Sequence, residues 1–333
     1  MVSIKDIARM TGVSVSTVSR VLNDRAYVSA NKRAKILDVI KQTGYVPNRA
    51  ARDMVSKHSS TVGIVMPGTF NMFQRQLFST IEHHLEQFGY HTSFYFASSD
   101  LEGERACLKR LKADRLDGII ILHEIELPEI QQYLQEYKIP TVLATFERNG
   151  WKTTSIHISE EEAALTAVNH LLRLGHCKIA FIGGTKYSFP AQRLEGYRKA
   201  LEQASLTYDE SLVVFAEAYN MEEGGRALKE LLARDIAFTA VFAITDELAL
   251  GAMRMLADHN LRVPDDVSVI GFDNIELASF SVPRLTTIAQ PMVEMGQTAV
   301  ALLHSLITSK NRFPLSISLP FTFITRESTA QLK

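Results

Sequence analysis

The chain has 333 residues, of which 46% are hydrophobic, and a formal net charge of −1. That length suits one small domain and a larger body of two lobes. The longest apolar runs are only long enough for a buried strand, and the N-terminus has no apolar signal core, so we expect a cytoplasmic protein without a membrane segment. The sequence shows no metal-ligand cluster, phosphate loop or nucleophile with its base. We therefore expect no metal, no cofactor and no catalytic residue.

Positive charge is concentrated at the start of the chain. Residues 1–60 hold 11 Lys and Arg but only 4 Asp and Glu, a net charge of +7, whereas the remainder has a net charge of −8. A nearly neutral average therefore conceals a basic head on an acidic body. This asymmetry is typical of a segment that binds nucleic acid, and it argues against a helical hairpin that merely packs.

The basic head is predicted to contain a helix-turn-helix. Ser3 and Asp6 form the N-cap pattern of a first helix, and Gly12 can adopt the positive φ that ends it. Ser14 then caps a second helix, and a third helix between Ser29 and Gly44 closes a small core. The second helix turns small groups and one arginine outward, namely Val15, Ser16, Thr17, Ser19 and Arg20. Such groups can approach base edges and phosphates in a major groove.

A short segment follows this head. Pro47 disfavours a helical conformation of the preceding residue, and Asn48 can cap a helix of about two turns, which is too short to be stable alone in water. Arg49 and Arg52 suit phosphates, and Met54 is an apolar side chain without an obvious core to enter. We interpret the segment as a hinge that folds against DNA, where Met54 can wedge between base steps of a minor groove. An ordinary linker is the alternative.

The rest of the chain alternates between strands and helices, which predicts two parallel sheets sandwiched by helices. The last helix and the last strand are expected to cross back and complete the first lobe. Strands are predicted at 61–66, 92–97, 118–122, 141–144, 179–183, 212–215, 240–244, 267–271 and 315–321. Helices are predicted at 78–88, 101–113, 128–137, 160–174, 192–204, 222–234, 248–259 and 292–307.

Ligands of such folds bind at the carboxyl ends of the strands. The loops there hold Arg193, Asp246 and Asp273. They also hold several aromatic residues: Phe70, Phe73, Phe146 and Tyr219. Aromatic faces with a few charged groups suit a compact polyhydroxylated molecule between two lobes. We interpret Asp246, which precedes a helix, as an N-cap, with ligand contact as the alternative.

Several long motifs then carry a resemblance to a known family. They occur in this order: Ile4-Lys5-Asp6-Ile7-Ala8, Gly12-Val13-Ser14, Thr17-Val18-Ser19-Arg20-Val21-Leu22-Asn23, Gly44-Tyr45-Val46-Pro47-Asn48, Arg193-Leu194-Glu195-Gly196-Tyr197, and Val263 to Asn274. With them the chain resembles the lactose/galactose repressor family of bacterial transcriptional regulators over nearly its whole length. The resemblance implies a dimeric repressor with a helix-turn-helix head and an α/β body like a two-lobed, type I periplasmic sugar-binding protein.

The resemblance also implies which residues contact DNA. Val15 and Ser16 stand where the family chooses bases, while Thr17 and Arg20 stand where it supports base and phosphate contacts. Met54 takes the place of a Leu that usually opens the central base step. The remaining implied contacts are Ser14, Ser19, Asn23, Asn48, Arg49 and Ala51.

For the effector, the resemblance implies that Arg193 and Asp273 grip the hydroxyls of a sugar-like molecule. Tyr219 matches an aromatic residue that stacks on the ligand, Phe73 lines the first lobe, and Gln290 makes a polar contact. Phe146 completes the aromatic lining. The chain departs from the family at Thr145, where an acidic residue is common, and at Thr245, where Asn is usual, and both positions belong to the implied site.

The expected organisation has four parts. Residues 1–47 form the DNA-binding domain and 48–60 the hinge helix and linker. The first lobe comprises 61–160 plus 291–322, and the second comprises 161–290 plus 323–333. The expected partners are a pseudo-palindromic operator in double-stranded DNA, a sugar-like effector and a second copy of the chain, with no membrane, at the nucleoid in the cytoplasm.

Three alternatives remain. A sugar receptor of transport would have a signal peptide and no basic head. An enzyme on the same body would need a catalytic set, whereas Arg193 and Asp273 suffice to bind but not to cleave. A catabolite-control-type regulator would use a phosphorylated carrier protein as corepressor. Such regulators tend to lack an Arg at position 193, so Arg193 favours a small ligand.

Overall fold

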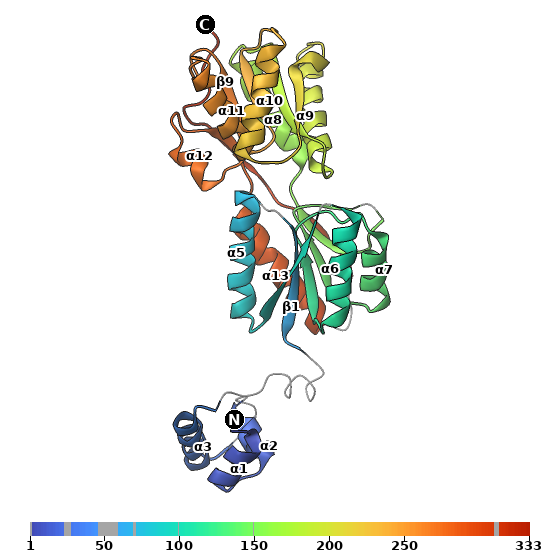
Figure 1. Ribbon diagram of the computed structural model, residues 1–333, viewed down its shortest axis with the longest axis vertical. Coiled ribbons are helices and arrows are strands. Elements are labelled where there is room, and N and C mark those ends of the chain that lie inside the picture. Colours follow the sequence, from blue (N-terminus) through green and yellow to red (C-terminus); the bar gives the residue numbers. More distant parts are fainter. Residues whose placement is uncertain are drawn as a thin grey trace. The chain divides into compact units, whose positions relative to one another are not determined.

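The computed structural model describes residues 2–22, 28–45, 59–68, 71–98, 100–148, 150–309 and 313–333. Two compact units follow one another along the chain, Met1–Ser59 and Ser60–Lys333 (Figure 1). Within the described ranges, each helix is too short or too polar to cross a lipid bilayer.

The first unit is built from short helices whose ends follow the sequence signals. Its described helices are α1 (Ile4–Thr11), α2 (Val15–Leu22) and α3 (Ala30–Thr43). The predicted capping box is confirmed, since Ser3 and Asp6 satisfy each other's backbone N–H groups. Gly12 and Gly44 end α1 and α3 with φ angles of 71° and 59°. Ser29 stands at the N-cap of α3, but its side chain makes no capping hydrogen bond.

A small core joins these helices. Its fully or nearly fully buried members are Ile7, Ala8, Val18, Val21 and Ile36. The first two come from α1, the next two from α2 and the last from α3, which is the inward set predicted from helical periodicity. Burial of these side chains leaves the opposite face of α2 at the surface.

The first lobe of the second unit contains a six-stranded, fully parallel sheet in the order β11-β5-β4-β3-β1-β2. Helices α5 and α13 cover one face and α6 and α7 the other (Figure 1). The strands are β1 (Thr61–Pro67), β2 (His91–Ala97), β3 (Gly118–Ile121), β4 (Thr141–Ala144), β5 (Thr154–His157) and β11 (Ser316–Ser318). The helices are α5 (Met72–Gln87), α6 (Leu101–Ala113), α7 (Pro128–Glu136) and α13 (Met292–Thr308).

Side chains of successive residues in these strands point to opposite faces, as the two-residue period of a strand requires. Val62 and Ile64 pack in the core that contains Leu77 of α5. Val65, between Ile64 and the strand end, packs in a separate core with Leu111 of α6. The sheet is therefore buried on both sides, which explains its continuous apolar runs.

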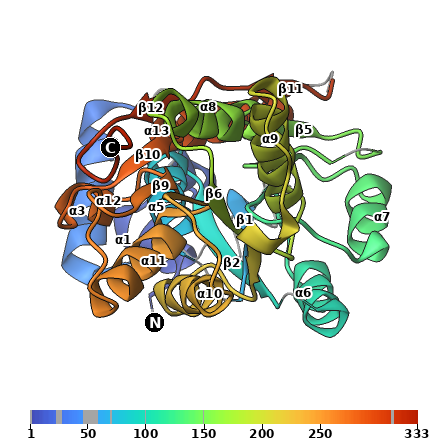
Figure 2. The same ribbon diagram turned by 90° about the horizontal axis from the view of Figure 1, so that it is seen from above.

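The second lobe has a six-stranded sheet in the order β12-β10-β9-β8-β6-β7, in which only β12 is antiparallel to its neighbour. Helices α8 and α9 lie on one face, and α10 and α11 on the other (Figure 2). The strands are β6 (Ile179–Gly184), β7 (Val213–Ala216), β8 (Ala240–Ala243), β9 (Ser268–Asp273), β10 (Thr286–Ala289) and β12 (Thr322–Ile324). The helices are α8 (Glu160–Arg173), α9 (Phe189–Gln203), η1 (Glu210–Leu212), α10 (Met221–Ala233), α11 (Asp246–Asp258) and α12 (Glu276–Phe280).

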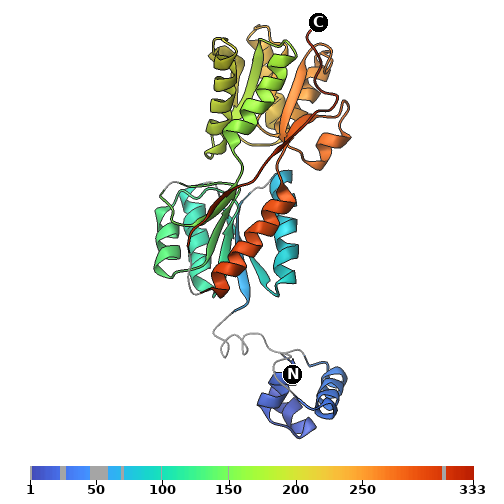
Figure 3. The same cartoon turned by 180° about the vertical axis from the view of Figure 1, so that it is seen from behind.

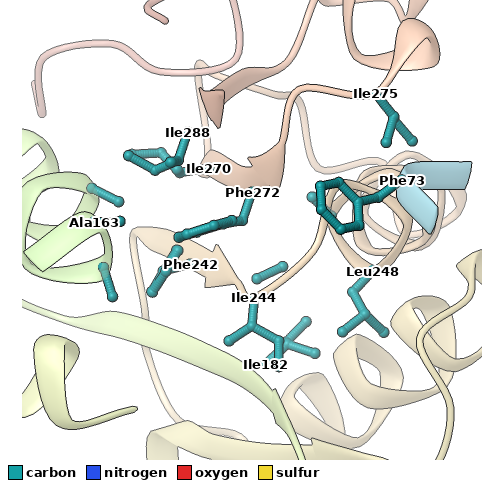
Figure 4. Close-up of a cluster of buried hydrophobic side chains, with 14 of the residues drawn as sticks. Phe73, Ala163, Ile182, Phe242, Ile244, Leu248, Ile270, Phe272, Ile275 and Ile288 are labelled. Carbon is teal, nitrogen blue, oxygen red and sulfur yellow. The ribbon is translucent and has the colours of Figure 1, made fainter. Parts of the chain in front are cut away.

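The core of the second lobe extends to the first lobe. Figure 4 shows Phe242, Ile270 and Phe272 from neighbouring strands on the side toward Ala163 of α8. Phe73 of α5 is buried in the same apolar cluster and approaches Leu248 of α11 (Figure 4). The start of α5 is thereby held against the second lobe.

The chain passes between the lobes at three places: between β5 and α8, between β10 and α13, and between β11 and β12 (Figure 3). The return of α13 and a last strand to the first lobe agrees with the predicted crossover. The predicted strand 315–321 is shorter than expected, because β11 ends at Ser318 and the chain then enters the other sheet as β12.

Several elements differ from the sequence predictions: η1, α12, β10 and β12 were not predicted, and β5 and α5 differ as follows. Strand β5, Thr154–His157, was not predicted, because its four residues include a single aliphatic side chain and no helix separates it from β4. Helix α5 begins at Met72 rather than at residue 78. The reason is a capping box in which the side chain of Asn71 accepts from the backbone N–H of Gln74 at 2.9 Å.

Candidate functional site

The exposed face of α2 is the candidate DNA-reading surface. Val15 is 40% exposed, and Ser16 and Arg20 are also exposed, so all three side chains are accessible to a nucleic acid. Thr17 and Ser19 are half-buried. The other predicted contacts lie outside the described residues: Asn23, Asn48, Arg49, Ala51 and Met54.

Ser14 holds the start of this helix. Its hydroxyl oxygen accepts from the backbone N–H of Thr17 at 3.2 Å, and the Oγ atoms of Ser14 and Ser16 lie 2.7 Å apart. The predicted N-cap is confirmed by this geometry. Ser14 therefore fixes the orientation of the residues that follow it.

A pocket of about 540 Å³, including its mouth, lies between the lobes of the second unit. The described residues that line it are Asn71, Phe73, Gln74, Leu122, His123, Glu124, Thr145, Phe146, Glu160, Tyr187, Phe189, Arg193, Thr245, Asp273 and Gln290. Of the predicted effector contacts, all but Tyr219 are in this set. Within the described part of the chain, no three His, Cys, Asp or Glu side chains gather as a metal site.

Arg193 is the buried cation of the pocket, with 2% of its surface exposed. Its Nε donates to Glu160 Oε2 at 2.7 Å, and Nη1 donates to the carbonyl of Ile244. The guanidinium carbon lies 3.4 Å from the ring centroid of Phe272, so the group is stacked as well as hydrogen-bonded. Its Nη2 lies 3.8 Å from Asp273 Oδ1, beyond hydrogen-bonding distance, which leaves donors for a ligand.

Close packing of α8 on α9 brings Glu160 to Arg193. Gly196 makes this approach possible, because a Cβ there would lie 2.3 Å from the carbonyl oxygen of Glu161. Tyr197 anchors the same turn by donating from its hydroxyl to the carbonyl of Ile179 at 2.9 Å. The motif that contains Arg193 therefore positions its partner as well as the arginine itself.

Asp273 faces the same guanidinium from the end of β9. Its Oδ1 accepts from Gln290 Nε2 at 2.7 Å. Burial raises the pKa of Asp273 well above its usual range, and the nearby Arg193 opposes that shift. The predicted residues Arg193, Asp273 and Gln290 are thus brought together in one buried polar cluster.

Three of the nine described non-glycine residues with positive φ line this pocket. Thr145, Tyr187 and Asp273 line it and have φ angles of 89°, 73° and 110°, in the region that L-residues rarely adopt. Each such residue costs about 1–3 kcal/mol and persists only where the surrounding structure enforces it. Strain of this kind is typical of ligand-binding sites.

Thr245, and not Asp246, caps helix α11. The N-cap of α11 is Thr245, whose side chain accepts from the backbone N–H of Leu248 at 3.2 Å, so the interpretation of Asp246 as the cap was wrong. Asp246 instead accepts from the backbone N–H of Ile275 at 2.8 Å and from the Thr287 hydroxyl at 2.6 Å. Burial raises the pKa of Asp246 to about 7. Asp246 therefore supports the loop after Asp273 and does not line the pocket.

Tyr219 lies behind the aromatic wall. Its hydroxyl donates to the carbonyl of Lys186 at 2.5 Å, and its ring lies 5.2 Å from that of Phe189. Phe189 and Tyr187 line the pocket directly. In this structure Tyr219 supports the aromatic residues that face the ligand space.

Several pocket residues were missed by the sequence reasoning. Glu160 was read only as the start of a helix, although its carboxylate neutralises Arg193. His123 and Glu124 follow β3 and face the pocket from the first lobe. Their place directly after the apolar strand was the available signal, because ligands bind at the carboxyl ends of parallel strands.

Comparisons with known proteins agree with this architecture. The family model of bacterial regulatory proteins of the lacI family matches residues 3–48, and that of a periplasmic binding protein-like domain matches residues 168–329. Catabolite control protein A of Priestia megaterium is 34% identical to this chain, over 98% of this chain and 99% of its own length.

Two solved structures are similar along almost the whole chain. The lac repressor dimer bound to operator and the anti-inducer ONPF aligns with a TM-score of 0.89 at 29% identity, covering 99% of both chains. The transcriptional regulator CelR in complex with cellobiose aligns with a TM-score of 0.75 at 29% identity, covering 98% of this chain and 100% of that one. The chain therefore belongs to the lacI family of bacterial regulatory proteins, and it is a DNA-binding transcriptional regulator with a periplasmic-binding-protein-like body rather than an enzyme.

Proposed function

We propose that the protein is a repressor whose operator affinity is controlled by a small sugar or sugar-derived effector bound between the two lobes. The observation that supports this most strongly is the buried cluster of Arg193, Asp273 and Gln290 at the wall of the interlobe pocket. The neighbour CelR was solved with cellobiose and the lac repressor with an anti-inducer. Both are relatives of the same architecture, which makes a sugar the first class of ligand to test.

The chemistry of the cluster suits hydroxyl groups. The Nη2 donors of Arg193 can meet a ring or hydroxyl oxygen, and the Asp273 carboxylate can accept from adjacent hydroxyls. The faces of Phe73, Phe146 and Phe189 supply apolar contact for the C–H faces of a sugar ring. No bond-breaking group is needed for such binding.

The head is proposed to read DNA through α2. Val15 and Ser16 would face base edges, with Thr17 and Arg20 supporting base and phosphate contacts. A homodimer would place two heads in successive major grooves of a pseudo-palindromic operator, in the cytoplasm at the nucleoid. Of the relatives, the lac repressor was solved as a dimer on its operator.

The proposed division of the chain follows from these roles. Residues 1–47 read DNA, and residues 48–60 connect the head to the body. The first lobe comprises 61–160 with 291–322, and the second 161–290 with 323–333. Ordering the connecting segment on DNA costs about 1–2 kcal/mol per fixed residue, so an effector that changes the relation between the lobes can bias operator affinity.

A catabolite-control-type regulator with a phosphorylated carrier protein as corepressor is the second candidate. Its support is the 34% identity to catabolite control protein A over nearly the full chain. The buried Arg193 in an interlobe pocket favours the small ligand instead. The two candidates differ in whether a sugar alone changes operator binding.

The base-reading assignment is tested by exchanging Val15 and Ser16 together in the full chain. We expect the preferred operator sequence to change, because each lost base contact reduces discrimination by about 1–3 kcal/mol. Selection from a randomised operator pool measures this. Equal weakening on every sequence would contradict the assignment and make both residues backbone contacts.

The pocket assignment is tested by Asp273→Asn. A thermal-shift screen of neutral sugars should raise the melting temperature of the wild-type chain, because a ligand that binds the folded state stabilises it by mass action. The variant should lose most of that shift. Asp258→Asn, which removes an exposed carboxylate of the same lobe, is the matched control and should keep it. A full shift in Asp273→Asn would contradict the assignment.

A further inference from the structure

Two residues of the first-lobe wall have no role in the scheme above. His123 and Glu124 lie in the loop after strand β3 and face the pocket. The side chain of His123 is almost completely enclosed, since the residue is 4% exposed. Among the described residues, neither of its ring nitrogens has a hydrogen-bond partner.

The enclosed imidazole of His123 is uncharged at neutral pH. Burial lowers the pKa of His123 to about 4, so the ring is neutral at pH 7. The nearby Val65 backbone opposes the shift without forming a hydrogen bond of ordinary geometry. A neutral imidazole has one donor and one acceptor. Because buried polar groups in proteins are nearly always paired, this ring is a site where a ligand hydroxyl completes the bonding.

Glu124 adds negative charge to the same wall. Its Oε1 accepts from the backbone N–H of Ser188 at 2.7 Å and from the Ser188 hydroxyl at 2.5 Å. Ser188 belongs to the second lobe, so this carboxylate joins the two lobes beside the mouth of the pocket. No cation accompanies it among the described residues that line the pocket, apart from Arg193.

The residues that line the pocket carry a net negative charge, which disfavours an anionic ligand. Arg193 is already met by Glu160 at 2.7 Å and by Asp273 at 3.8 Å. Glu124 contributes a further carboxylate. Even with Asp273 protonated, the lining carries more negative than positive charge. A phosphate group enclosed here would meet carboxylates without a counter-ion, whereas an uncharged hydroxyl could donate to them and accept from Arg193.

We infer that the pocket takes an uncharged, polyhydroxylated ligand, excludes phosphorylated forms of the same molecule, and uses His123 as a hydrogen-bond partner for one ligand hydroxyl. This inference rests on the proposed function, because it specifies the ligand class of the same pocket. It narrows a sugar or sugar-derived effector to a neutral sugar.

The charge rule is tested with matched probes and the full chain. D-glucose, D-ribose and cellobiose are each titrated beside their phosphate monoesters, and binding is followed by calorimetry. Within each pair we expect the neutral sugar to bind and its phosphate monoester to bind with an affinity lower by on the order of a hundredfold or more. A phosphate monoester that binds as tightly as its parent sugar overturns the inference.

Glu124→Gln sharpens this test because it removes one charge and keeps the size of the side chain. The preference for the neutral sugar should fall by on the order of tenfold in this variant. Glu129→Gln, on the exposed face of α7 in the same lobe, removes an equal charge away from the pocket and should leave the preference unchanged. Equal effects of the two variants would mean that the net charge of the whole protein, and not the charge at the pocket, determines the preference for the neutral sugar.

The role of His123 is tested by His123→Phe and His123→Asn. Phenylalanine fills similar space without polar atoms, so the ligand-free protein should melt at the same or a higher temperature while neutral-sugar affinity falls by about tenfold. Asparagine should restore part of that affinity. If His123 only packs in the core, His123→Phe should lower the melting temperature and leave the sugar affinity unchanged. That result would overturn the assignment of His123 as a hydrogen-bond partner of the ligand.

Failure of this inference can be told from failure of the proposed function. The inference is judged by the affinity of neutral and phosphorylated probes for the protein. The proposed function is judged by operator affinity in the same samples. A neutral sugar that binds without changing operator affinity contradicts the proposed function but supports the preference for neutral ligands. A phosphorylated sugar that binds and changes operator affinity supports the proposed function but contradicts that preference.

Discussion

The two walls of the interlobe pocket differ in how completely their polar groups are paired. On the second-lobe wall, Arg193 bonds to Glu160 and to a backbone carbonyl, and Asp273 accepts from Gln290. On the first-lobe wall, His123 has no hydrogen-bond partner among the described residues. The charged groups of the second-lobe wall are therefore held by hydrogen bonds within the protein. On the first-lobe wall, the imidazole of His123 can still form hydrogen bonds with a ligand.

Because of this difference, some residues of the pocket contribute mainly to the stability of the fold and others mainly to ligand binding. A wall whose ions are buried and paired contributes to folding, because removing one partner strands the other charge. A wall with an unpaired polar group gains its partner only when a ligand binds. On the paired wall, removal of a structural partner such as Glu160 should mainly change stability, whereas substitution of the unpaired His123 should change ligand binding and the pH dependence of stability.

The largest expected effect is at Glu160. Glu160→Ala leaves Arg193 buried beside a single, more distant carboxylate, so the free energy of unfolding should fall by about 3–5 kcal/mol. Urea denaturation followed by the fluorescence of Trp151, the only tryptophan, measures this. The neighbouring Glu161→Ala is the matched control, because its ion pair with Lys199 is exposed and should contribute much less to stability. Similar losses in both variants would contradict the buried-pair account.

The next effect is a pH dependence at His123. Its pKa is lowered to about 4 from an ordinary 6.5, so the neutral ring favours folding above pH 6.5, and that contribution is lost as the pH falls toward 4. His123→Phe has no such loss. The stability of this variant relative to wild type should therefore rise by about 2–3 kcal/mol between pH 7 and pH 4.5.

Denaturation at both pH values tests this expectation. The same substitution at His83, an exposed residue of α5, is the control for replacing an imidazole by a phenyl ring outside the pocket. If the His123→Phe difference stays constant between the two pH values, the imidazole is not held neutral by burial.

The smallest effect is at the contact between the walls. Ser188→Ala removes the hydroxyl that donates to Glu124 and keeps the backbone donor, so the free energy of unfolding should fall by about 0.5–1.5 kcal/mol. Loss of a contact that joins the lobes should also speed sugar association, measured by stopped-flow fluorescence. A larger loss of stability than in Glu160→Ala would place this contact among the main supports of the fold.

The fold was largely predictable because its signals are local. Alternating strands and helices, the Ser3–Asp6 capping box and the Gly12 helix end all depend on residues close in sequence. Strand β5 escaped prediction because four residues with one aliphatic side chain give no periodic signal.

The pocket was predictable in part: Phe73, Thr145 and Phe146 of the first lobe and Arg193 and Asp273 of the second line it as predicted, whereas His123 and Glu124 were not predicted. Arg193 and Asp273 stand in recognisable motifs at strand and helix ends, and the structure brings them together. His123 and Glu124 lie in no motif, and Glu124 meets a serine that is 64 residues further along the chain. Their environment depends on how the lobes meet, which no short stretch of sequence encodes. Tyr219 shows the same limit, because an aromatic residue near a ligand and one behind it look alike in sequence.

The central claim is that ligand binding at this pocket controls DNA binding by the head. The most direct test measures operator affinity by fluorescence anisotropy, with and without a saturating neutral sugar that binds the wild-type chain, in wild type and in Arg193→Lys. The account predicts a change of roughly 5- to 150-fold in wild type and little or none in the variant, which keeps the charge but loses the forked donors. An unchanged wild-type affinity at saturation, or a full response in Arg193→Lys, would contradict it.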